Sequence, residues 1–124
     1  MRDLQVDATR PLANFVAALL FDDRGVLWVG TEIGLYRHDS VAGRFLHHGG
    51  DPAGAGGLHV SALAEDAEGT IWVGTFGAGL HRLERAGAGA ILRPAGIALP
   101  QPTIWSVLAV PGALVLAGDG WLCT

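Results

Sequence analysis

The segment LFDDRGVLWVGTEIGLYR, from Leu20 to Arg37, occurs a second time in the chain as AEDAEGTIWVGTFGAGLHR, from Ala64 to Arg82. Both copies carry an aspartate, a glycine, a tryptophan and a threonine with the same gaps, and matching residues lie 44 positions apart. Self-similarity at a fixed period of about 20 to 50 residues is the signature of a repeat architecture. The matching pairs are Asp22 and Asp66, Gly25 and Gly69, Trp28 and Trp72, and Thr31 and Thr75.

The repeat continues beyond these four pairs. One extra residue after Thr75 shifts the spacing to 45, which matches Leu35 with Leu80. In a fainter third copy, VSALA at residues 60–64 reappears as IWSVL at 104–108, and IWVG at 71–74 reappears as VLAG at 115–118. This alignment predicts that Leu116 stands at the position of the repeated tryptophan. The chain therefore carries two clear repeats and one degenerate repeat.

The repeat predicts strands rather than helices. Its apolar runs last five to seven residues and end at glycine, aspartate or proline, whereas an amphipathic helix needs helical spacing over about ten or more residues. Short strands with a period in the low forties are typical of β-propeller blades, each of which is a four-stranded sheet. We therefore predict an all-β fold, namely an incomplete β-propeller with two full four-stranded blades plus a partial third.

The repeat also predicts the limits of the blades. Residues 1–13 form an N-terminal lead-in, residues 14–58 form blade 1, residues 59–102 form blade 2, and residues 103–124 form the partial blade 3. Within a blade the strands are called a to d in chain order. The expected strands are Phe15–Phe21, Val26–Gly30, Leu35–Asp39 and Arg44–His48, then Val60–Glu65, Thr70–Gly74, Leu80–Glu84 and Ala90–Arg93, then Ile104–Val110 and Leu114–Gly118, with Gly120–Thr124 beginning a further strand.

Composition excludes several classes of protein. Half of the 124 residues are hydrophobic and only 16% are charged, which excludes a disordered tail. The net charge is −4, lysine is absent and the eight arginines are scattered, so we expect no nucleic-acid binding. The single cysteine, Cys123, excludes an intrachain disulfide and a cysteine zinc cluster, and we expect no metal and no cofactor. The longest apolar stretch, from Ile104 to Ala117, is interrupted and too short to span a bilayer.

The pattern D-x-x-G-x-x-W-V-G-T, followed by G-L-x-R, resembles the two-component regulator propeller repeat, and the resemblance covers roughly Phe15 to Arg93. It implies a piece of the sensor region that lies outside the cytoplasm in hybrid histidine kinases or diguanylate cyclases. By this resemblance the chain is a non-catalytic, ligand-sensing module and its location is periplasmic. Because no signal peptide is visible in this sequence, a cytoplasmic location is the alternative.

A binding face is predicted from propeller topology. The b–c and d–a loops of a blade emerge on one face, and the a–b and c–d turns emerge on the other. Loops held by rigid strands are the usual place for a binding site, and we expect a small-molecule or glycan ligand there. The a–b turns carry aspartates that bond their own backbone, so they are expected to be structural. The predicted ligand-binding residues are Glu32, Ile33, His59, Phe76 and Gln101, and no residue is predicted to be catalytic.

Two alternatives stay open at this point. One is a propeller lyase that resembles streptogramin lyase, which would need a histidine and an acidic residue to converge, and only His59 and Glu32 are candidates. The other is an inactive gene fragment. In either case two and a half blades cannot close a ring of about four to eight blades. The expected partners are therefore further propeller repeats, or copies of the chain that self-associate through the open blade edges.

Overall fold

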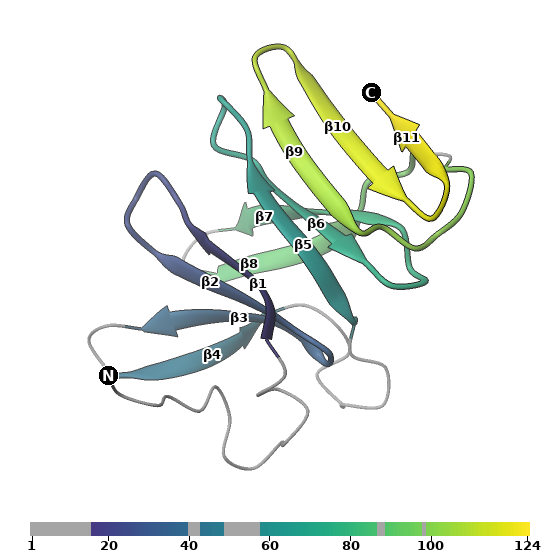
Figure 1. The fold of residues 1–124 in the computed structure, drawn as a ribbon. Helices are drawn as coiled ribbons and strands as arrows, with labels where there is room; N and C mark the ends of the chain where they lie inside the picture. The colour runs from purple at the N-terminus through teal and green to yellow at the C-terminus, as the bar shows by residue number, and fades with distance from the viewer. Residues whose placement is uncertain (1–15, 40–42, 49–57, 87–88, 98) are drawn as a thin grey trace, which may run out of the picture.

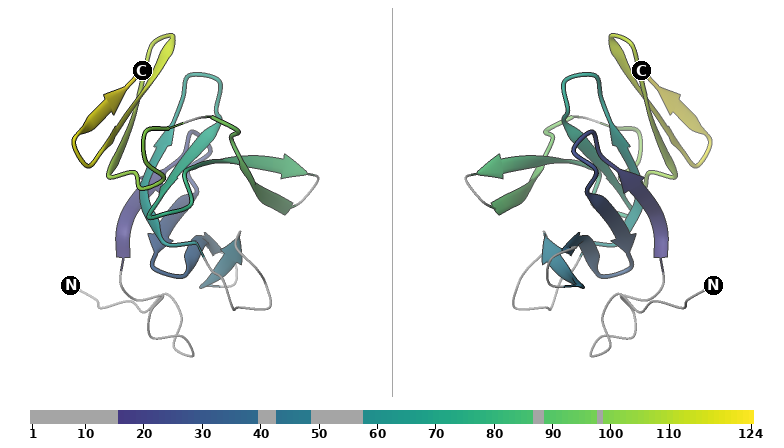
Figure 2. Two further views of the ribbon diagram at one scale, coloured as in Figure 1. Left: turned by 90° about the vertical axis from the view of Figure 1, so that its right-hand side faces the viewer. Right: turned by 90° about the vertical axis from the view of Figure 1, so that its left-hand side faces the viewer.

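The computed structural model describes residues 16–39, 43–48, 58–86, 89–97 and 99–124. These residues form three antiparallel sheets that follow one another in chain order as separate layers (Figures 1 and 2). The first sheet contains β1 (Val16–Phe21), β2 (Leu27–Thr31), β3 (Gly34–Asp39) and β4 (Arg44–His48). The second contains β5 (Val60–Glu65), β6 (Ile71–Thr75), β7 (Leu80–Ala86) and β8 (Gly89–Pro94). The third contains β9 (Ser106–Val110), β10 (Ala113–Gly118) and β11 (Trp121–Cys123).

The predicted fold class is confirmed. Two sheets have four strands in the order a-b-c-d, and the third has three strands. The largest error in a strand start is at β9, which begins at Ser106 and not at Ile104, whereas the other described starts lie within one residue of those expected. The backbone N–H of Ile104 instead donates to the carbonyl of Thr75 in the second sheet, at 2.8 Å. The predicted lead-in and the first residue of strand a, Phe15, lie outside the described residues, and the proposed blade limits stay predictions.

The a–b turns of the first two sheets are built alike around an aspartate. In the first turn Asp22 N–H donates to the carbonyl of Val26 at 3.0 Å, and Gly25 turns the chain with a φ of 76°. Asp22 Oδ1 accepts the N–H groups of Arg24 and Val26, both at 2.9 Å, as predicted for an aspartate in such a turn. The other carboxylate oxygen, Oδ2, accepts the indole Nε1–H of Trp28 at 2.9 Å. This side-chain bond was not foreseen, and it ties the turn to strand β2.

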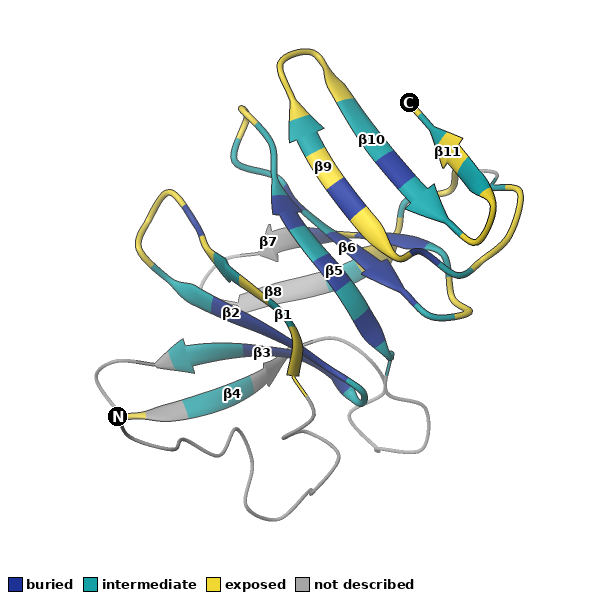
Figure 3. Cartoon of the chain, in the orientation of Figure 1, coloured by how far each residue is buried: buried dark blue, intermediate teal, exposed yellow. Residues whose placement is uncertain are grey.

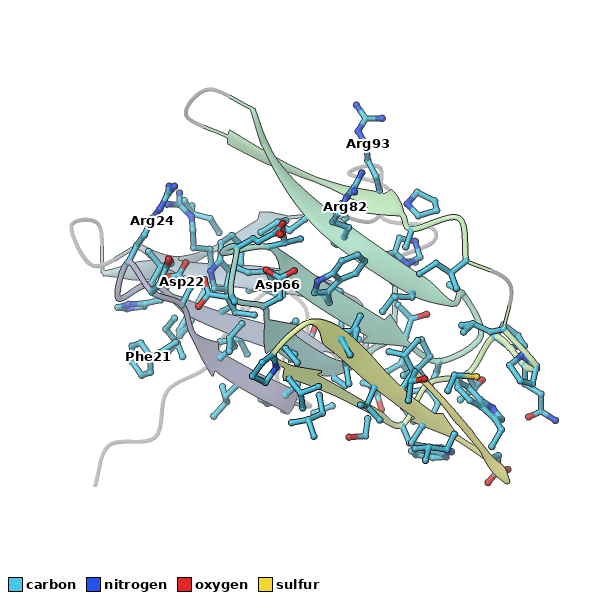
Figure 4. All side chains as sticks on the ribbon, turned by 90° about the horizontal axis from the view of Figure 1, so that it is seen from above. Phe21, Asp22, Arg24, Asp66, Arg82 and Arg93 are labelled. Carbon is cyan, nitrogen blue, oxygen red and sulfur yellow. The ribbon has the colours of Figure 1, made fainter. Side chains whose placement is uncertain are left out.

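The second sheet repeats this arrangement. Asp66 Oδ1 accepts the N–H groups of Glu68 and Thr70, at 2.9 and 3.0 Å. Asp66 Oδ2 accepts the indole Nε1–H of Trp72 at 2.9 Å. Figure 4 shows Asp22 and Asp66 at the same end of their sheets. The repeated aspartate and tryptophan are therefore one hydrogen-bonded unit in each blade.

The third sheet departs from the repeat at this turn. Its a–b hairpin joins Val110 to Ala113, so the turn contains only Pro111 and Gly112. The matching turns of the first two sheets run between Phe21 and Leu27 and between Glu65 and Ile71. Strand b of the third sheet is consequently displaced by one residue relative to the spacing of 44.

This displacement corrects the prediction for Leu116. In the second sheet Trp72 pairs with Ala64. Forty-four residues after Ala64, Leu108 pairs with Val115. Val115 therefore occupies the tryptophan position, and Leu116 turns to the other face, where it is 4% exposed in the core between the second and third sheets.

The sheets contact one another through their a strands, which lie side by side in Figure 1 as β1, β5 and β9. Strand b carries a glycine where the next sheet approaches. A Cβ at Gly30 would lie 2.5 Å from Val60 Cγ1, and a Cβ at Gly74 would lie 2.9 Å from Ile104 Cγ2. The two interfaces are thus built by equivalent residues, since Val60 and Ile104 are also 44 positions apart.

Each interface encloses its own apolar core. Between the first and second sheets, Trp28 and Leu35 pack in one cluster with Val60, Ile71 and Val73. Between the second and third sheets the core contains the buried residues Ala62, Ala64, Leu80, Ile104, Val107 and Leu116, with Trp72 packed against it. The two repeated tryptophans therefore face the following sheet, as predicted for residues wedged between blades.

Candidate functional site

The b–c loops are held in place by a buried threonine at the end of strand b. Thr31 Oγ1 donates to the carbonyl of Gly34 at 2.8 Å and accepts the N–H of Ile33 at 3.2 Å. In the second sheet, Thr75 Oγ1 donates to the carbonyl of Gly79 at 2.7 Å and accepts the N–H of Ala78 at 3.1 Å. Both threonines have no exposed surface. The repeated threonine thus shapes the loop that would carry a ligand.

Backbone bonds join the second b–c loop to two d–a connections. Phe76 N–H donates to the carbonyl of His59, which precedes β5, at 2.9 Å. Gly79 N–H donates to the carbonyl of Pro102, which lies in the connection to β9, at 2.8 Å. Figure 1 shows the β2–β3 and β6–β7 loops and the starts of β5 and β9 at one end of the sheets, opposite the a–b turns. We call this end the loop face.

Three aromatic rings meet on the loop face. The rings of His59 and Phe76 lie 4.4 Å apart between centroids, and the rings of Phe76 and Trp105 lie 4.6 Å apart in an edge-to-face arrangement at 88°. The backbone N–H of Trp105 donates to the carbonyl of Ala117 at 2.8 Å, and 53% of the residue is exposed. We call these three residues the aromatic cluster.

An open pocket of about 350 Å³ lies between the second b–c loop and residues of the connection that leads to β9. One wall is the b–c loop from Gly77 to Gly79, which follows Phe76 directly, and the other is the connection that leads to β9. Polar atoms, which include the side-chain amide of Gln101, make up slightly more of the exposed lining than apolar atoms do. The lining residues are Gly77, Ala78, Gly79, Ile97, Leu99, Pro100, Gln101 and Pro102.

The structure brings together part of the predicted site. His59 and Phe76 are in ring contact, and Gln101 lines the pocket that adjoins the loop of Phe76. Glu32 and Ile33 lie on the b–c loop of the first sheet, where Ile33 packs inward against the core of Val29 and Tyr36. The predicted residues thus divide into a group on the second sheet and a pair on the first.

Trp105 was missed by the sequence analysis. The sequence feature that could have revealed Trp105 is a difference between the repeats, because the matching residue of the second repeat is Ser61. The hydroxyl of Ser61 donates to the carbonyl of Ile104, the residue before Trp105. An indole at this position of the third repeat completes the aromatic cluster.

The opposite face, which carries the a–b turns, has its own hollow of about 290 Å³ between the second and third sheets. It is lined by Asp66, Glu68 and Trp72 and by the short turn of the third sheet. Burial alone would raise the pKa of Asp66, but the hydrogen bonds from Trp72, Thr70 and Glu68 outweigh it and lower the pKa. Asp66 is thus a charged group whose oxygens are already engaged, which fits a structural role.

The a–b turns of the first two sheets also meet. Asp23 N–H donates to Glu65 Oε2 at 3.3 Å. Burial raises the pKa of Glu65, and the neighbouring carboxylate of Asp23 raises it further, whereas the hydrogen bond from the Asp23 backbone lowers it.

The described part of the chain holds no group of three or more histidine, cysteine, aspartate or glutamate residues that could bind a metal ion. The same residues include no helix long and apolar enough to cross a membrane.

His81 is a buried histidine between the first and second sheets. It pairs with Val73, whose side chain lies in the core of that interface, and is 7% exposed. Among the described residues its Nδ1 atom has no hydrogen-bond partner. Burial lowers the pKa of His81, and a hydrogen bond with the backbone of Gly79 only partly opposes this. The neutral imidazole is therefore the form that fits the interface.

We expect the free energy of unfolding to decrease as the pH falls below 6.5, the ordinary pKa of histidine. In that range the unfolded chain binds a proton at His81 more readily than the folded chain, so stability is retained above pH 6.5 and lost on acidification through the lower folded pKa. Urea unfolding at several pH values in this range measures how steeply the free energy of unfolding depends on pH. This pH dependence should be weaker in His81→Tyr, which introduces the residue that the first sheet carries at the matching position, Tyr36. His59→Gln serves as the control, and equal slopes for wild type and His81→Tyr would contradict the assignment.

The sheets, their shared inner edge and their repeated interfaces define the class of the protein: it is part of a β-propeller, in which each sheet is a blade. Two segments, residues 11–32 and 54–77, match the family described as two component regulator propeller. The chain thus contains two component regulator propeller repeats, in agreement with the resemblance noted in its sequence.

Solved structures share this architecture. The extracellular domain of BT4673 from B. thetaiotaomicron matches in two structures, described as a one-component and as a hybrid two-component system, with TM-scores of 0.67 and 0.65 and identities of 19% and 18%. PorZ, an essential surface component of the type-IX secretion system of Porphyromonas gingivalis, matches with a TM-score of 0.66 and 22% identity. The matches cover 83% of this chain for BT4673 and 86% for PorZ, but only 16% and 17% of those chains.

The chain thus spans about a sixth of the solved chains that it matches. At these identities the likeness shows the fold, and the relatives themselves are extracellular or surface domains. Among curated proteins no significant sequence match was found.

Proposed function

We propose that this chain is a non-catalytic ligand-binding module of a sensor region, and that it captures a small molecule or glycan on its loop face. The observation that carries the proposal is the aromatic cluster, in which Trp105 is half exposed and packs against Phe76. The pocket that Gln101 lines has the loop after Phe76 as one wall. The two component regulator propeller repeats and the extracellular domain of BT4673 support a sensor role. The same relatives are extracellular or surface domains, which supports a periplasmic or extracellular location as part of this proposal.

The chemistry of the loop face favours a ligand with a flat apolar face and polar edges. An exposed indole supplies a large rigid surface at a low entropic cost, and its N–H gives a polar handle. The adjoining pocket falls within the range of about 300 to 1,000 Å³ that small-ligand sites occupy. Sugar rings and aromatic metabolites share this combination of an apolar face and hydroxyl or carbonyl edges.

The lyase alternative receives no support from the arrangement of its two candidates. The imidazole of His59 is packed against Phe76, and Glu32 lies on the b–c loop of the other sheet. A binding role needs no convergence of an acid and a base. In a sensor, ligand capture would be passed to an attached signalling domain through a change in blade packing.

The proposal is tested by titrating the chain with a library of soluble oligosaccharides of glucose, galactose, mannose and xylose, and with aromatic amino acids, while recording tryptophan fluorescence. A compound that binds should lose roughly tenfold or more in affinity in Trp105→Ala and in Phe76→Ala, as central aromatic residues of binding sites usually do. Asp23→Ala and Glu68→Ala, on the opposite face, are the matched controls. A compound whose affinity falls in the control variants and not in the aromatic variants would show that the working face is the other one.

A further inference from the structure

The a–b turns of the first two sheets are joined to each other, but the equivalent bond cannot form between the second and third sheets. Across the first interface, Asp23 N–H donates to the carboxylate of Glu65. Forty-four residues later stand Ala67 and Ala109, and the side chain of alanine has no oxygen that could accept such a bond. The a–b turn of the third sheet is also short. These two features of the third repeat leave the turn end of the second interface open.

The hollow of about 290 Å³ lies at this place. The second sheet lines one side of it with Asp66, Glu68 and Trp72, and the a–b hairpin of the third sheet lines the other with residues that include Val110 and Leu114. Figure 3 shows the tips of the two hairpins, β5–β6 and β9–β10, exposed and apart from each other. The volume is close to the lower end of the range of about 300 to 1,000 Å³ that small-ligand sites occupy, so the hollow suits a small molecule.

The indole of Trp72 is more accessible than its counterpart in the first sheet. Trp28 is 3% exposed, whereas Trp72 is half-buried and lines the hollow. The Nε1–H of Trp72 already donates to Asp66 Oδ2 at 2.9 Å, so the indole offers its ring to a ligand rather than its N–H. A hydrogen bond to an anionic acceptor increases the electron density of the ring, which strengthens the attraction between the ring and a cation.

Both charged side chains in the described lining are carboxylates, Asp66 and Glu68, and Arg82, the cross-strand neighbour of Trp72, lies outside it. Burial would raise the pKa of Asp66, but the hydrogen bonds that it accepts lower the pKa overall, so this carboxylate is charged at neutral pH. Its two oxygens already accept three N–H groups, and a ligand with N–H donors would find few acceptors beside it. A cation that carries methyl groups instead meets the negative charge and the apolar side chains without leaving a donor unpaired.

We propose that this hollow binds a small methylated ammonium ion, for which choline serves as the probe. The trimethylammonium group lies against the indole of Trp72, an arrangement that proteins use to recognise quaternary ammonium ligands. Glu68 and Asp66 supply the compensating negative charge, and Val110 and Leu114 contact the methyl groups from the third sheet. A bound cation thus takes the place, at the second interface, of the hydrogen bond that joins the turns at the first.

NMR titration of the chain with choline tests the proposal. Two signals report on the hollow, namely the indole N–H of Trp72, which is the one lost in Trp72→Phe, and the methyl groups of Leu114, and both should shift together and saturate. Choline should bind roughly 5- to 30-fold more tightly than its tert-butyl analogue, in which a neutral carbon replaces the nitrogen. Phosphocholine should bind more weakly than choline because its phosphate would approach Glu68. Tighter binding of phosphocholine would overturn the assignment of a free cation.

Glu68→Gln should lower the affinity for choline several-fold and leave the affinity for the tert-butyl analogue unchanged, because only the charge differs. Asp119→Asn removes the same charge at an exposed residue of the third b–c loop and should keep the wild-type affinity. Ala113→Phe fills the hollow from an exposed lining position and should abolish the saturable shifts. The dispersion of the amide signals verifies that each variant is folded.

Three results would overturn the proposal: an absence of saturable shifts at Trp72 and Leu114 in wild type, equal binding of choline and its tert-butyl analogue, and equal losses in Glu68→Gln and Asp119→Asn. The site lies at the opposite end of the sheets from the loop face, so its test does not depend on the proposed function. The sugars and aromatic amino acids of the loop-face titration carry no methylated ammonium group, and Glu68 therefore remains a control in that experiment.

Discussion

Replacing Asp22 with alanine is expected to lower the free energy of unfolding by about 3 kcal/mol, because each buried donor left without a partner costs about 1 to 3 kcal/mol. Asp22 is 6% exposed and accepts three hydrogen bonds, from two turn N–H groups and from the indole of Trp28. Urea unfolding at one protein concentration measures the change. Asp22→Asn should lose less, because its amide oxygen can still accept the turn N–H groups while its NH₂ group faces the indole N–H.

The matched control is Asp23→Ala in the same turn, where the residue is exposed. Its loss of stability should be well below that of Asp22→Ala. A second check removes the indole donor: Trp28→Phe combined with Asp22→Asn should lose less than the sum of the two single changes. Equal losses for Asp22→Ala and Asp23→Ala would contradict the hydrogen-bonded unit of aspartate and tryptophan.

Adding a methyl group at Gly30 is expected to destabilise the protein by about 1 to 3 kcal/mol, the usual cost of overpacking a core. The new Cβ would stand 2.5 Å from Val60 Cγ1 and 3.3 Å from the Cβ of Ala18, so the first and second sheets would have to separate. In an open strand the same change would be favourable by about 0.5 to 1 kcal/mol, because glycine weakens strands through its entropy. A decrease in the free energy of unfolding on Gly30→Ala would therefore indicate that the two blades approach closely at Gly30, and an increase would indicate that they do not.

A double-mutant cycle isolates this contact. Val60→Ala removes the methyl groups that the new Cβ meets, so Gly30→Ala should cost at least about 1 kcal/mol less in the Val60→Ala background than in wild type. Ala17→Val adds bulk at an exposed position of β1 and should change stability little. Additive losses in the cycle would mean that Gly30 and Val60 do not meet.

Most of the fold could be predicted from the sequence because each blade repeats the same local requirements. The spacing of Trp28 and Trp72 set the register, and short apolar runs bounded by turn residues set the strands, whose ends agree with the structure to within a few residues. The third blade was harder because no tryptophan marks its strand b. Without that marker, the short turn at Pro111 and Gly112 could not be distinguished from the longer turns, and the register of Leu116 was predicted one residue out.

For the candidate site, the sequence could predict which end of the sheets it lies on, but not which side chains are in contact there. Topology places the loops that carry His59 and Phe76 at one end of the sheets, but it does not say which rings touch. The contact of these rings depends on the backbone bond between the two residues and on their side-chain conformations. Trp105 was missed because agreement between repeats reveals the scaffold, whereas Trp105 stands where the third repeat differs from the second, which has Ser61.

The account rests on blades that stack through equivalent residues, and nuclear Overhauser effects in the wild-type chain test this most directly. They should connect the γ-methyl groups of Val60 with the α-protons of Gly30, and the γ2-methyl group of Ile104 with the α-protons of Gly74, since these groups are in contact across the two interfaces. Cross-strand effects within β1–β2 and β5–β6 provide the internal control. If the cross-strand effects are present and both inter-sheet effects are absent, the sheets form without stacking as blades, and the shared loop face with its aromatic cluster does not exist.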